Sequence, residues 1–320
     1  MNSKITPTVE GGLLTAVAVI LGLASTFLPV IGVFVEFFCA VPIVVLTVRQ
    51  GAGKGFLALA ASFLILAMFI GPLLSMRIAL SFGICGLVLG YCIERNFSTV
   101  KTFIATFLTS YVAQIFAILI LTFVMGVNVM QTELSSVQEM FDELFKVYEE
   151  AGVSPQDLAQ IKEQVEPTLK LMSYLLPFLL GLIGLLNAAL CYLTSRWIFQ
   201  KLRMKFLEPL PLFAQWKFPK VFLYIALLAT LGLYWGSTRS WDLLYTVSIN
   251  VQFFAMCIAF VQGLAVLSAV ADKYNLSKFL RRIFFILSIL NMLMIEIVAF
   301  VGLFDMVFDY RKMLTDKYKE

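Results

Sequence analysis

Two charged side chains interrupt long apolar stretches in the first quarter of the chain. Glu36 lies within Val33–Phe38, and Arg77 lies within Leu73–Ile78. A charge at bilayer depth is costly, so such residues usually pair with one another or mark a ligand or ion pathway. Both lie at a similar depth in their predicted helices, near the outer face, where they can pair. They are our candidate substrate-binding residues in a pocket that opens outward, and the alternative is an ion pair with a structural role only.

A second group of polar residues lies in the last third of the chain, where Glu296 occupies the middle of the last apolar stretch. Asn291 lies about one helical turn before it, and Gln262 and Asn250 lie in the preceding apolar stretch. Polar side chains at membrane depth hydrogen-bond across helices, so these four residues are candidates for an interhelical polar cluster. If the protein runs alone on an ion gradient, Glu296 is the best candidate to carry a proton.

Other reactive groups are scarce in this sequence. The chain has no histidine, and none of its five cysteines forms a Cys-x-x-Cys pair, so the commonest general base and the usual zinc ligand sets are missing. We therefore expect no catalytic residues, no metal, no cofactor and no enzyme activity. No long basic tract is present, so nucleic acid is not an expected partner. The segment Gly51-Ala-Gly53-Lys54-Gly55 lacks the Ser or Thr that follows the lysine of a phosphate-binding loop, which predicts a tight turn.

The elements that carry these residues are apolar stretches of membrane-spanning length. Hydrophobic residues make up 61% of the chain and charged residues 14%, against about 45–50% and about 25% in soluble domains. About 20 apolar residues suffice for a helix to cross a bilayer core. Lipid leaves backbone groups no partner outside the protein, so only helices and closed barrels span it. The stretches are continuous rather than alternating, which predicts an all-α, polytopic transmembrane helical bundle.

Nine stretches are candidate spans, with boundaries good to about four residues. They cover residues 7–28, 31–48, 54–72, 74–94, 101–126, 168–195, 219–237, 241–271 and 283–306. With nine spans, the basic residues of the loops at 49–54, 94–101, 196–220 and 272–282 all lie on the side of the N-terminus. The positive-inside rule makes that side the cytoplasm.

The basic C-terminal tail does not fit this count. It carries Arg311, Lys312, Lys317 and Lys319, and nine spans would place it outside. An eight-span variant, in which one of the last segments is re-entrant, is the alternative.

Residues 127–167 break the apolar pattern. They contain nine acidic residues and two lysines, Lys146 and Lys162. Apolar residues recur at helical spacing, Gly152 ends the first helix, and Ser154 and Pro155 begin a second as N-cap and first-turn residue. The sequence predicts an acidic helical hairpin on the extracytoplasmic side. A membrane-surface helix would carry a basic polar face, so the hairpin either caps the bundle or serves as a lid or docking site.

Glycines and prolines in the first 200 residues occur in an order that can be compared with known membrane proteins. The order is a turn from Pro29 to Gly32, Pro42, the Arg49–Gly55 segment, Gly71-Pro72, and Gly86-Leu-Val-Leu-Gly90. In this respect the first 200 residues resemble the S (substrate-binding) components of energy-coupling factor (ECF) vitamin transporters, which are bundles of six helices. The whole chain resembles the YybS-type multispan bacterial membrane proteins, a family of unknown function related to them.

The resemblance implies a small-molecule binder that works with an ATPase and a coupling membrane subunit. S components dock the coupling subunit through an Ala-xxx-Ala patch on the first helix, and Gly12 and Ala16 stand at the comparable place. We expect an S-like bundle at 1–200, which includes the hairpin, and an additional three-span region at 201–320. The expected location is the bacterial cytoplasmic (inner) membrane, with the N-terminus in the cytoplasm.

Two classes of function follow from these features. The first is a transport-related subunit that binds a small solute and takes its energy from partners. The second is a non-transport membrane scaffold, whose acidic hairpin and basic loops recruit partners in an envelope or signalling assembly. An intramembrane enzyme has the least support, because no histidine, thiol pair or acidic dyad is present.

Overall fold

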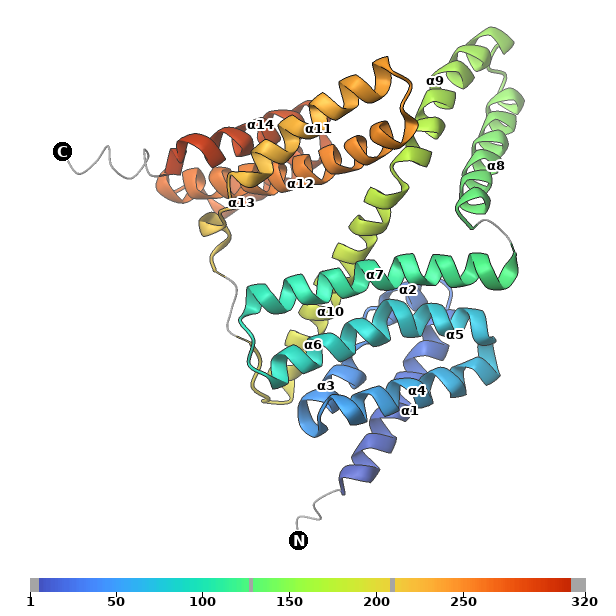
Figure 1. The fold of residues 1–320 in the computed structure, drawn as a ribbon, viewed down its shortest axis with the longest axis vertical. Helices are drawn as coiled ribbons and strands as arrows, with labels where there is room; N and C mark the ends of the chain where they lie inside the picture. Colours follow the sequence, from blue (N-terminus) through green and yellow to red (C-terminus); the bar gives the residue numbers. More distant parts are fainter. Residues whose placement is uncertain (1–5, 127–128, 208–210, 312–320) are drawn as a thin grey trace, which may run out of the picture. The chain divides into compact units, whose positions relative to one another are not determined.

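The computed structural model describes residues 6–126, 129–207 and 211–311, and every regular element in them is helical, which confirms the all-α class. Figure 1 labels the helices in chain order. They are α1 (Pro7–Phe27), α2 (Ile31–Glu36), α3 (Val41–Gln50), α4 (Ala52–Ile70), α5 (Pro72–Ile78), the π turn η1 (Ala79–Gly83), α6 (Ile84–Glu94), α7 (Thr99–Met125), α8 (Val129–Glu150), α9 (Pro155–Tyr174), α10 (Leu176–Lys201), the 3-10 turn η2 (Phe213–Gln215), α11 (Val221–Thr238), α12 (Asp242–Lys273), α13 (Lys278–Leu290) and α14 (Met292–Phe308).

Eight of the predicted spans correspond to helical stretches long and apolar enough to cross a membrane. Two of these stretches are composite, because α2 and α3 together form one and α5, η1 and α6 together form another. The sixth begins at Leu176 rather than at residue 168, because Pro177 cannot donate the backbone hydrogen bond that would continue α9 into α10. The ninth is not one straight helix, since α13 and α14 are bent by 104° at Asn291.

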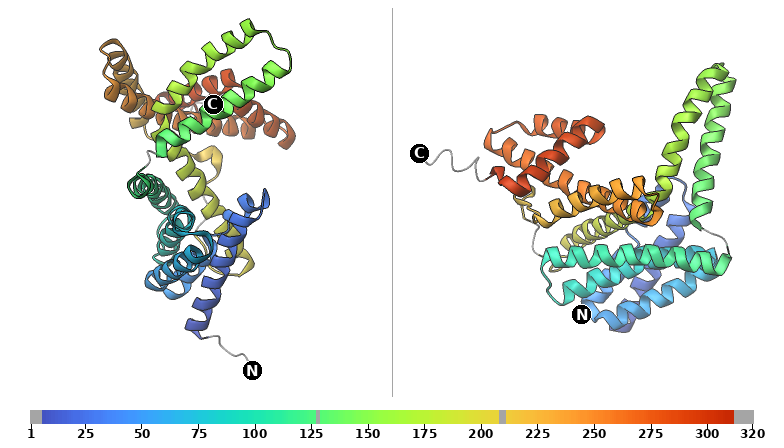
Figure 2. Two further views of the ribbon diagram at one scale, coloured as in Figure 1. Left: turned by 90° about the vertical axis from the view of Figure 1, so that its right-hand side faces the viewer. Right: turned by 45° about the horizontal axis from the view of Figure 1, so that its top comes forward.

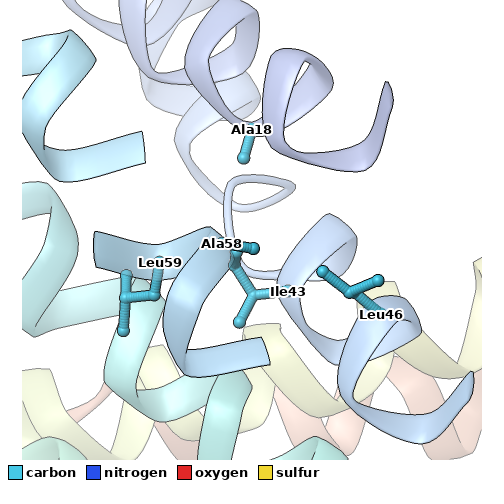
Figure 3. Packing of buried hydrophobic residues seen from close by; sticks show 5 residues of the cluster. All are labelled: Ala18, Ile43, Leu46, Ala58 and Leu59. Atoms are coloured by element: carbon cyan, nitrogen blue, oxygen red, sulfur yellow. The ribbon is translucent and has the colours of Figure 1, made fainter. Parts of the chain in front are cut away.

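The chain forms two compact units. The first consists of residues 1–169 and 179–209, and the second of residues 170–178 and 210–320. In the first unit, α1, α3 and α4 meet at a cluster of buried aliphatic side chains, shown in Figure 3. The cluster contains Ala18, Ile43, Leu46, Ala58 and Leu59. The turn predicted at Gly51 joins α3 to α4, and Gly51 has a φ of 88°, a conformation that glycine adopts without strain.

Glycines on α6 let this helix lie directly against α3. A Cβ atom added to Gly86 would come within 2.8 Å of the Ala40 carbonyl oxygen, and one added to Gly90 would come within 2.6 Å of the Thr47 Cβ. Small residues spaced by four are typical of closely packed membrane helices. The Gly86-xxx-Gly90 motif therefore packs inside the protein rather than against another subunit.

We expect Gly90→Val to destabilise the first unit by about 1–3 kcal/mol, because the added side chain has to displace α3 from α6. The measurement is the melting temperature of the purified protein in mild detergent. Gly53→Val is the matched control, since an added Cβ there meets nothing within 4 Å. Equal melting temperatures for the two variants would show that the close approach of α3 and α6 does not limit stability.

The acidic segment forms the predicted helical hairpin from α8 and α9, which lie side by side in Figure 2. Gly152 has a φ of 85° and ends the turn after α8. The Ser154 Oγ accepts a hydrogen bond from the Asp157 backbone N–H at 3.2 Å, as expected for an N-cap. The start and stop signals predicted from the sequence are thus confirmed.

In the second unit, α12 and α14 pack in parallel, as Figure 1 shows. A Cβ added to Gly302 would meet the Ala259 carbonyl oxygen, and one added to Gly263 would meet the Val298 carbonyl oxygen. Both contacts are with backbone atoms, so the two glycines let α12 and α14 lie directly against each other.

Because α14 runs parallel to α12, both helices end on the same side of the second unit. Arg311 follows α14 and donates hydrogen bonds from Nη1 to the carbonyl oxygens of Ala214 and Trp216, at 2.9 and 2.8 Å. These two residues precede α11, so the chain returns to the side from which α11 starts. This geometry favours the eight-span alternative, with α13 and α14 as a re-entrant pair. Of the basic tail residues, only Arg311 lies within the described residues.

We expect the C-terminus to lie on the same side of the membrane as the segment before α11. The test uses single cysteines in a variant without the five native ones, labelled in whole cells with a membrane-impermeant maleimide. Lys205→Cys and Glu320→Cys should react alike, and Arg239→Cys, between α11 and α12, should react oppositely. Labelling of position 320 together with position 239 would instead support nine spans.

Candidate functional site

The predicted pair of charges in the first unit is formed. Nη2 of Arg77 lies 3.2 Å from Oε1 of Glu36. The Arg77 side chain is 60% exposed and the Glu36 side chain 21%, so the pair lies at the surface of the unit rather than in its core. Glu36 is the last residue of α2 and Arg77 lies in α5, so the pair joins two short helical segments.

The turn that leads into α2 is strained. Val30 has φ 62° and ψ −54°, and the Ile31 N–H donates a hydrogen bond to the Pro29 carbonyl oxygen at 2.6 Å. This geometry is a γ-turn with a positive φ, which is rare and unfavourable for a β-branched residue. Strained backbone is concentrated at ligand clamps and switch regions. The strain was not predictable from the residue types, apart from the proline before Val30.

A small open cavity lies next to the ion pair. Residues of α1, α3, α4, α5 and η1, together with Cys39 before α3, line it. They are Ala18, Cys39, Ile43, Leu59, Ser62, Phe63, Leu66, Ile78, Ala79, Phe82 and Gly83. Cys39 follows Glu36 by three residues and Ile78 follows Arg77 directly, so the charges flank the cavity without lining it. The lining is mostly apolar, and the free space admits a water-sized group but no larger solute.

One wall of the cavity is the π turn η1, which the sequence did not predict. Ala79, Phe82 and Gly83 of this turn line the cavity. A π turn inside an α-helix is uncommon and is frequently found at functional sites. Ser81, on the same turn, accepts a hydrogen bond from the Gln114 Nε2 of α7 at 3.3 Å. The turn therefore connects the cavity wall to a neighbouring helix.

The candidate docking residues on α1 lie on its open side. Gly12 and Ala16 are exposed, and a Cβ added to Gly12 would meet nothing within 4 Å. The other small residues of α1 pack inside: Ala18 is buried, and a Cβ added to Gly22 would lie 2.9 Å from Leu66. Ala18 and Gly22 thus pack inside the unit, and Gly12 and Ala16 remain accessible to a partner helix.

The four polar residues predicted to form a cluster in the second unit are not brought together. Asn250 bridges the break between α9 and α10, where its Nδ2 donates to the Tyr174 carbonyl oxygen at 2.6 Å and its Oδ1 accepts from the Phe178 N–H at 2.7 Å. These are the two backbone groups that an unbroken helix would pair with each other.

The other members of the predicted cluster also lie apart. The Asn291 Oδ1 accepts from the Met294 N–H at 3.3 Å and so caps α14 at its bend. The Gln262 Oε1 accepts from the Phe218 N–H at 2.9 Å. Glu296 lies on an exposed part of α14. Lipid provides no partner for a free backbone group, so the oxygens of the three amides accept from backbone N–H groups instead of pairing with one another.

Asp305, which the sequence patterns did not indicate, is the most deeply buried charge among the described residues. Its side chain is fully buried, and its Oδ2 accepts from the Gln262 Nε2 at 2.5 Å and from the Arg311 Nη2 at 2.9 Å. Arg311 in turn binds the chain before α11 through two carbonyl oxygens. Asp305 thus holds the end of α14 to α12 and to the chain before α11. The only sequence signal was one acid in the apolar run Gly302–Phe308.

We expect Arg311→Met to lower stability by about 3–5 kcal/mol, because it leaves the Asp305 carboxylate buried without its counter-charge. Lys217→Met is the matched control: Lys217 pairs with Asp309, its side chain is 48% exposed, and exposed pairs contribute about 1 kcal/mol or less. The measurement is thermal unfolding in detergent. A smaller loss in Arg311→Met than in Lys217→Met would contradict the assignment.

These features define a multispan helical membrane protein. Its first unit contains a small cavity flanked by the Glu36–Arg77 ion pair. No group of three or more Cys, Asp or Glu residues within the described ranges could hold a metal ion. The chain belongs to the family described as "Predicted membrane protein (DUF2232)", whose model matches residues 16–306. A relative named "Uncharacterized protein YybS", from Bacillus subtilis (strain 168), is 24% identical over 306 residues, which cover 94% of this chain and 96% of the relative.

No solved structure matches the chain. The matches confirm the resemblance to YybS-type membrane proteins over nearly the whole length. They contain no ECF transporter component.

Proposed function

We propose that the protein is a transport-related subunit that binds a small solute, with a first unit that works like the S component of an ECF transporter. The observation that carries the proposal is the cavity beside the Glu36–Arg77 pair. Binding sites for small molecules are mostly apolar cavities with a few polar groups that fix orientation. An apolar lining flanked by one anion and one cation has this composition.

The cavity has to widen before it can hold a solute. Three features lie where such a movement would occur: the strained turn at Val30, the short helix α2, and the π turn beside Arg77. Glu36 and Arg77 hold α2 to α5 through one exposed ion pair, and exposed pairs are weak. A charged or zwitterionic solute can replace each partner of this pair, so solute binding and opening would be coupled.

Energy for transport would come from partners, because the sequence contains no nucleotide-binding motif. The exposed Gly12 and Ala16 on α1 are the proposed contact for an ECF-type coupling membrane subunit, which would in turn bind ATPases.

We place the N-terminus and the basic loops in the cytoplasm of a bacterium, with the protein in the cytoplasmic membrane and the 127–167 hairpin outside. The positive-inside rule supports this orientation.

The alternative function is a non-transport membrane scaffold. The observation that favours it is the hairpin of α8 and α9, which carries exposed apolar and acidic residues and contributes none of the residues that line the cavity. In that case the Glu36–Arg77 pair would only join α2 to α5. Variants of these two residues would then leave function unchanged.

Native mass spectrometry of the protein released from purified membranes tests solute binding. We expect one enriched small molecule bound to the wild type, and its loss in both Glu36→Gln and Arg77→Met. Glu10→Gln is the matched control, because it removes the ion pair between Glu10 and Arg49 in the same unit, away from the cavity. Retention of the molecule in the Glu36 and Arg77 variants would remove these residues from the site.

Docking of a coupling subunit is tested by replacing the exposed small residues of α1. We expect Gly12→Leu and Ala16→Leu to abolish co-purification of a membrane subunit and its ATPases, because a larger side chain prevents close helix contact. Thr26→Leu, an exposed substitution elsewhere on α1, should leave it intact. Absence of any ATPase from the wild-type preparation would contradict the ECF-like part of the proposal.

A further inference from the structure

The apolar side of α8 is wider than its partner helix covers. Phe141 and Phe145 lie on one flank of it, and their rings are 6.4 Å apart. Phe145 is buried, as is Leu158 on α9, which lies alongside in Figures 1 and 2. Phe145 and Leu158 therefore lie on the covered sides of their helices.

The other flank of α8 is uncovered. Met140, Leu144 and Val147 follow one another at helical spacing, and they are 60%, 43% and 58% exposed. We call these three residues the α8 stripe. The polar side of α8 is strongly charged, as in amphipathic helices that face water. Exposed apolar patches on such surfaces mark sites that bind another molecule.

Acidic residues border the α8 stripe on one side. With 3.6 residues per turn, Glu139, Glu143 and Glu150 fall next to it, on the side away from Phe145, and all three are exposed. Asp142 and Glu149 fall on the opposite border of the helix, next to Phe145. Lys146 lies behind these three glutamates, so the carboxylate edge of the stripe keeps a net negative charge.

This charge pattern decides between possible occupants. A second copy of the hairpin would bring like charges together, which opposes association. A bilayer surface attracts amphipathic helices with lysine and arginine on their polar faces, and this one carries carboxylates. A helix with an apolar row bordered by lysine or arginine satisfies both the stripe and its edge.

We propose that the α8 stripe is a docking surface for a basic amphipathic helix of another protein. The apolar row supplies contact area, and the carboxylate edge sets partner choice and orientation. This surface is separate from the cavity of the first unit, so it exists whether or not the protein binds a solute.

The test uses the full-length protein in phosphatidylcholine nanodiscs, which carry no net charge, and fluorescent 20-residue helical peptides as probes. One peptide has a leucine row bordered by lysines, a second has glutamates in place of the lysines, and a third is a scrambled version of the first. We expect saturable binding of the lysine peptide only, measured by fluorescence anisotropy. Leu144→Gln should weaken it about tenfold or more, as for a central apolar contact.

A matched pair of charge reversals tests the carboxylate edge. Glu143→Lys with Glu150→Lys should weaken binding of the lysine peptide about tenfold and allow the glutamate peptide to bind, because the complementarity is inverted. Asp142→Lys with Glu149→Lys makes the same change in net charge on the other border and should alter binding less than about threefold. Circular dichroism checks that each variant keeps its helices.

Several outcomes would overturn the proposal. These are no saturable binding of the lysine peptide, equal binding of the scrambled peptide, and equal losses in the two charge-reversal variants. In cells, a photo-crosslinking residue at position 147 should capture a peptide segment with lysine or arginine beside an apolar row. Capture of lipid alone, or of another part of this chain, would assign the stripe to the membrane or to the fold instead.

Discussion

Free backbone groups and charges have no partner in lipid, and the structure depends on how the protein supplies these partners from within. Asn250 bridges the carbonyl and the N–H left apart by the break between α9 and α10, and Asn291 caps α14 at the 104° bend. Asp305 is neutralised by Arg311 and bonded to Gln262. In the second unit, asparagine amides thus satisfy the backbone at two helix breaks, and an arginine and a glutamine satisfy its buried carboxylate.

The Asp305–Arg311 and Glu36–Arg77 ion pairs differ in their surroundings. Asp305 is enclosed, and Arg311 has further hydrogen bonds to two carbonyl oxygens, so this pair fixes the end of α14. Glu36 and Arg77 meet at a surface, and short segments with a strained turn and a π turn carry them. The first pair suits a permanent role, because separating it leaves a buried charge. The second can separate at little cost, as the proposed exchange with a solute requires.

Sequence patterns predicted those features that depend on local chemistry. Continuous apolar stretches gave the helices, Gly152 and Ser154 gave the hairpin, and equal depth gave the Glu36–Arg77 pair. They could not give the bend at Asn291 or the partner of Gln262, because these depend on which helix faces meet. The partners of Asp305 were not predictable either, since one acid near the end of an apolar run does not reveal that an arginine six residues later folds back onto it.

We propose that Glu36 and Arg77 exchange their mutual contact for contacts with a solute. The most direct test is the charge swap Glu36→Arg with Arg77→Glu, measured both for melting temperature and for the bound small molecule. We expect the swap to restore the stability lost in Glu36→Arg alone but not the binding of the molecule, because the solute meets inverted charges. Recovery of stability and binding together would show that the pair is structural and would contradict the claim.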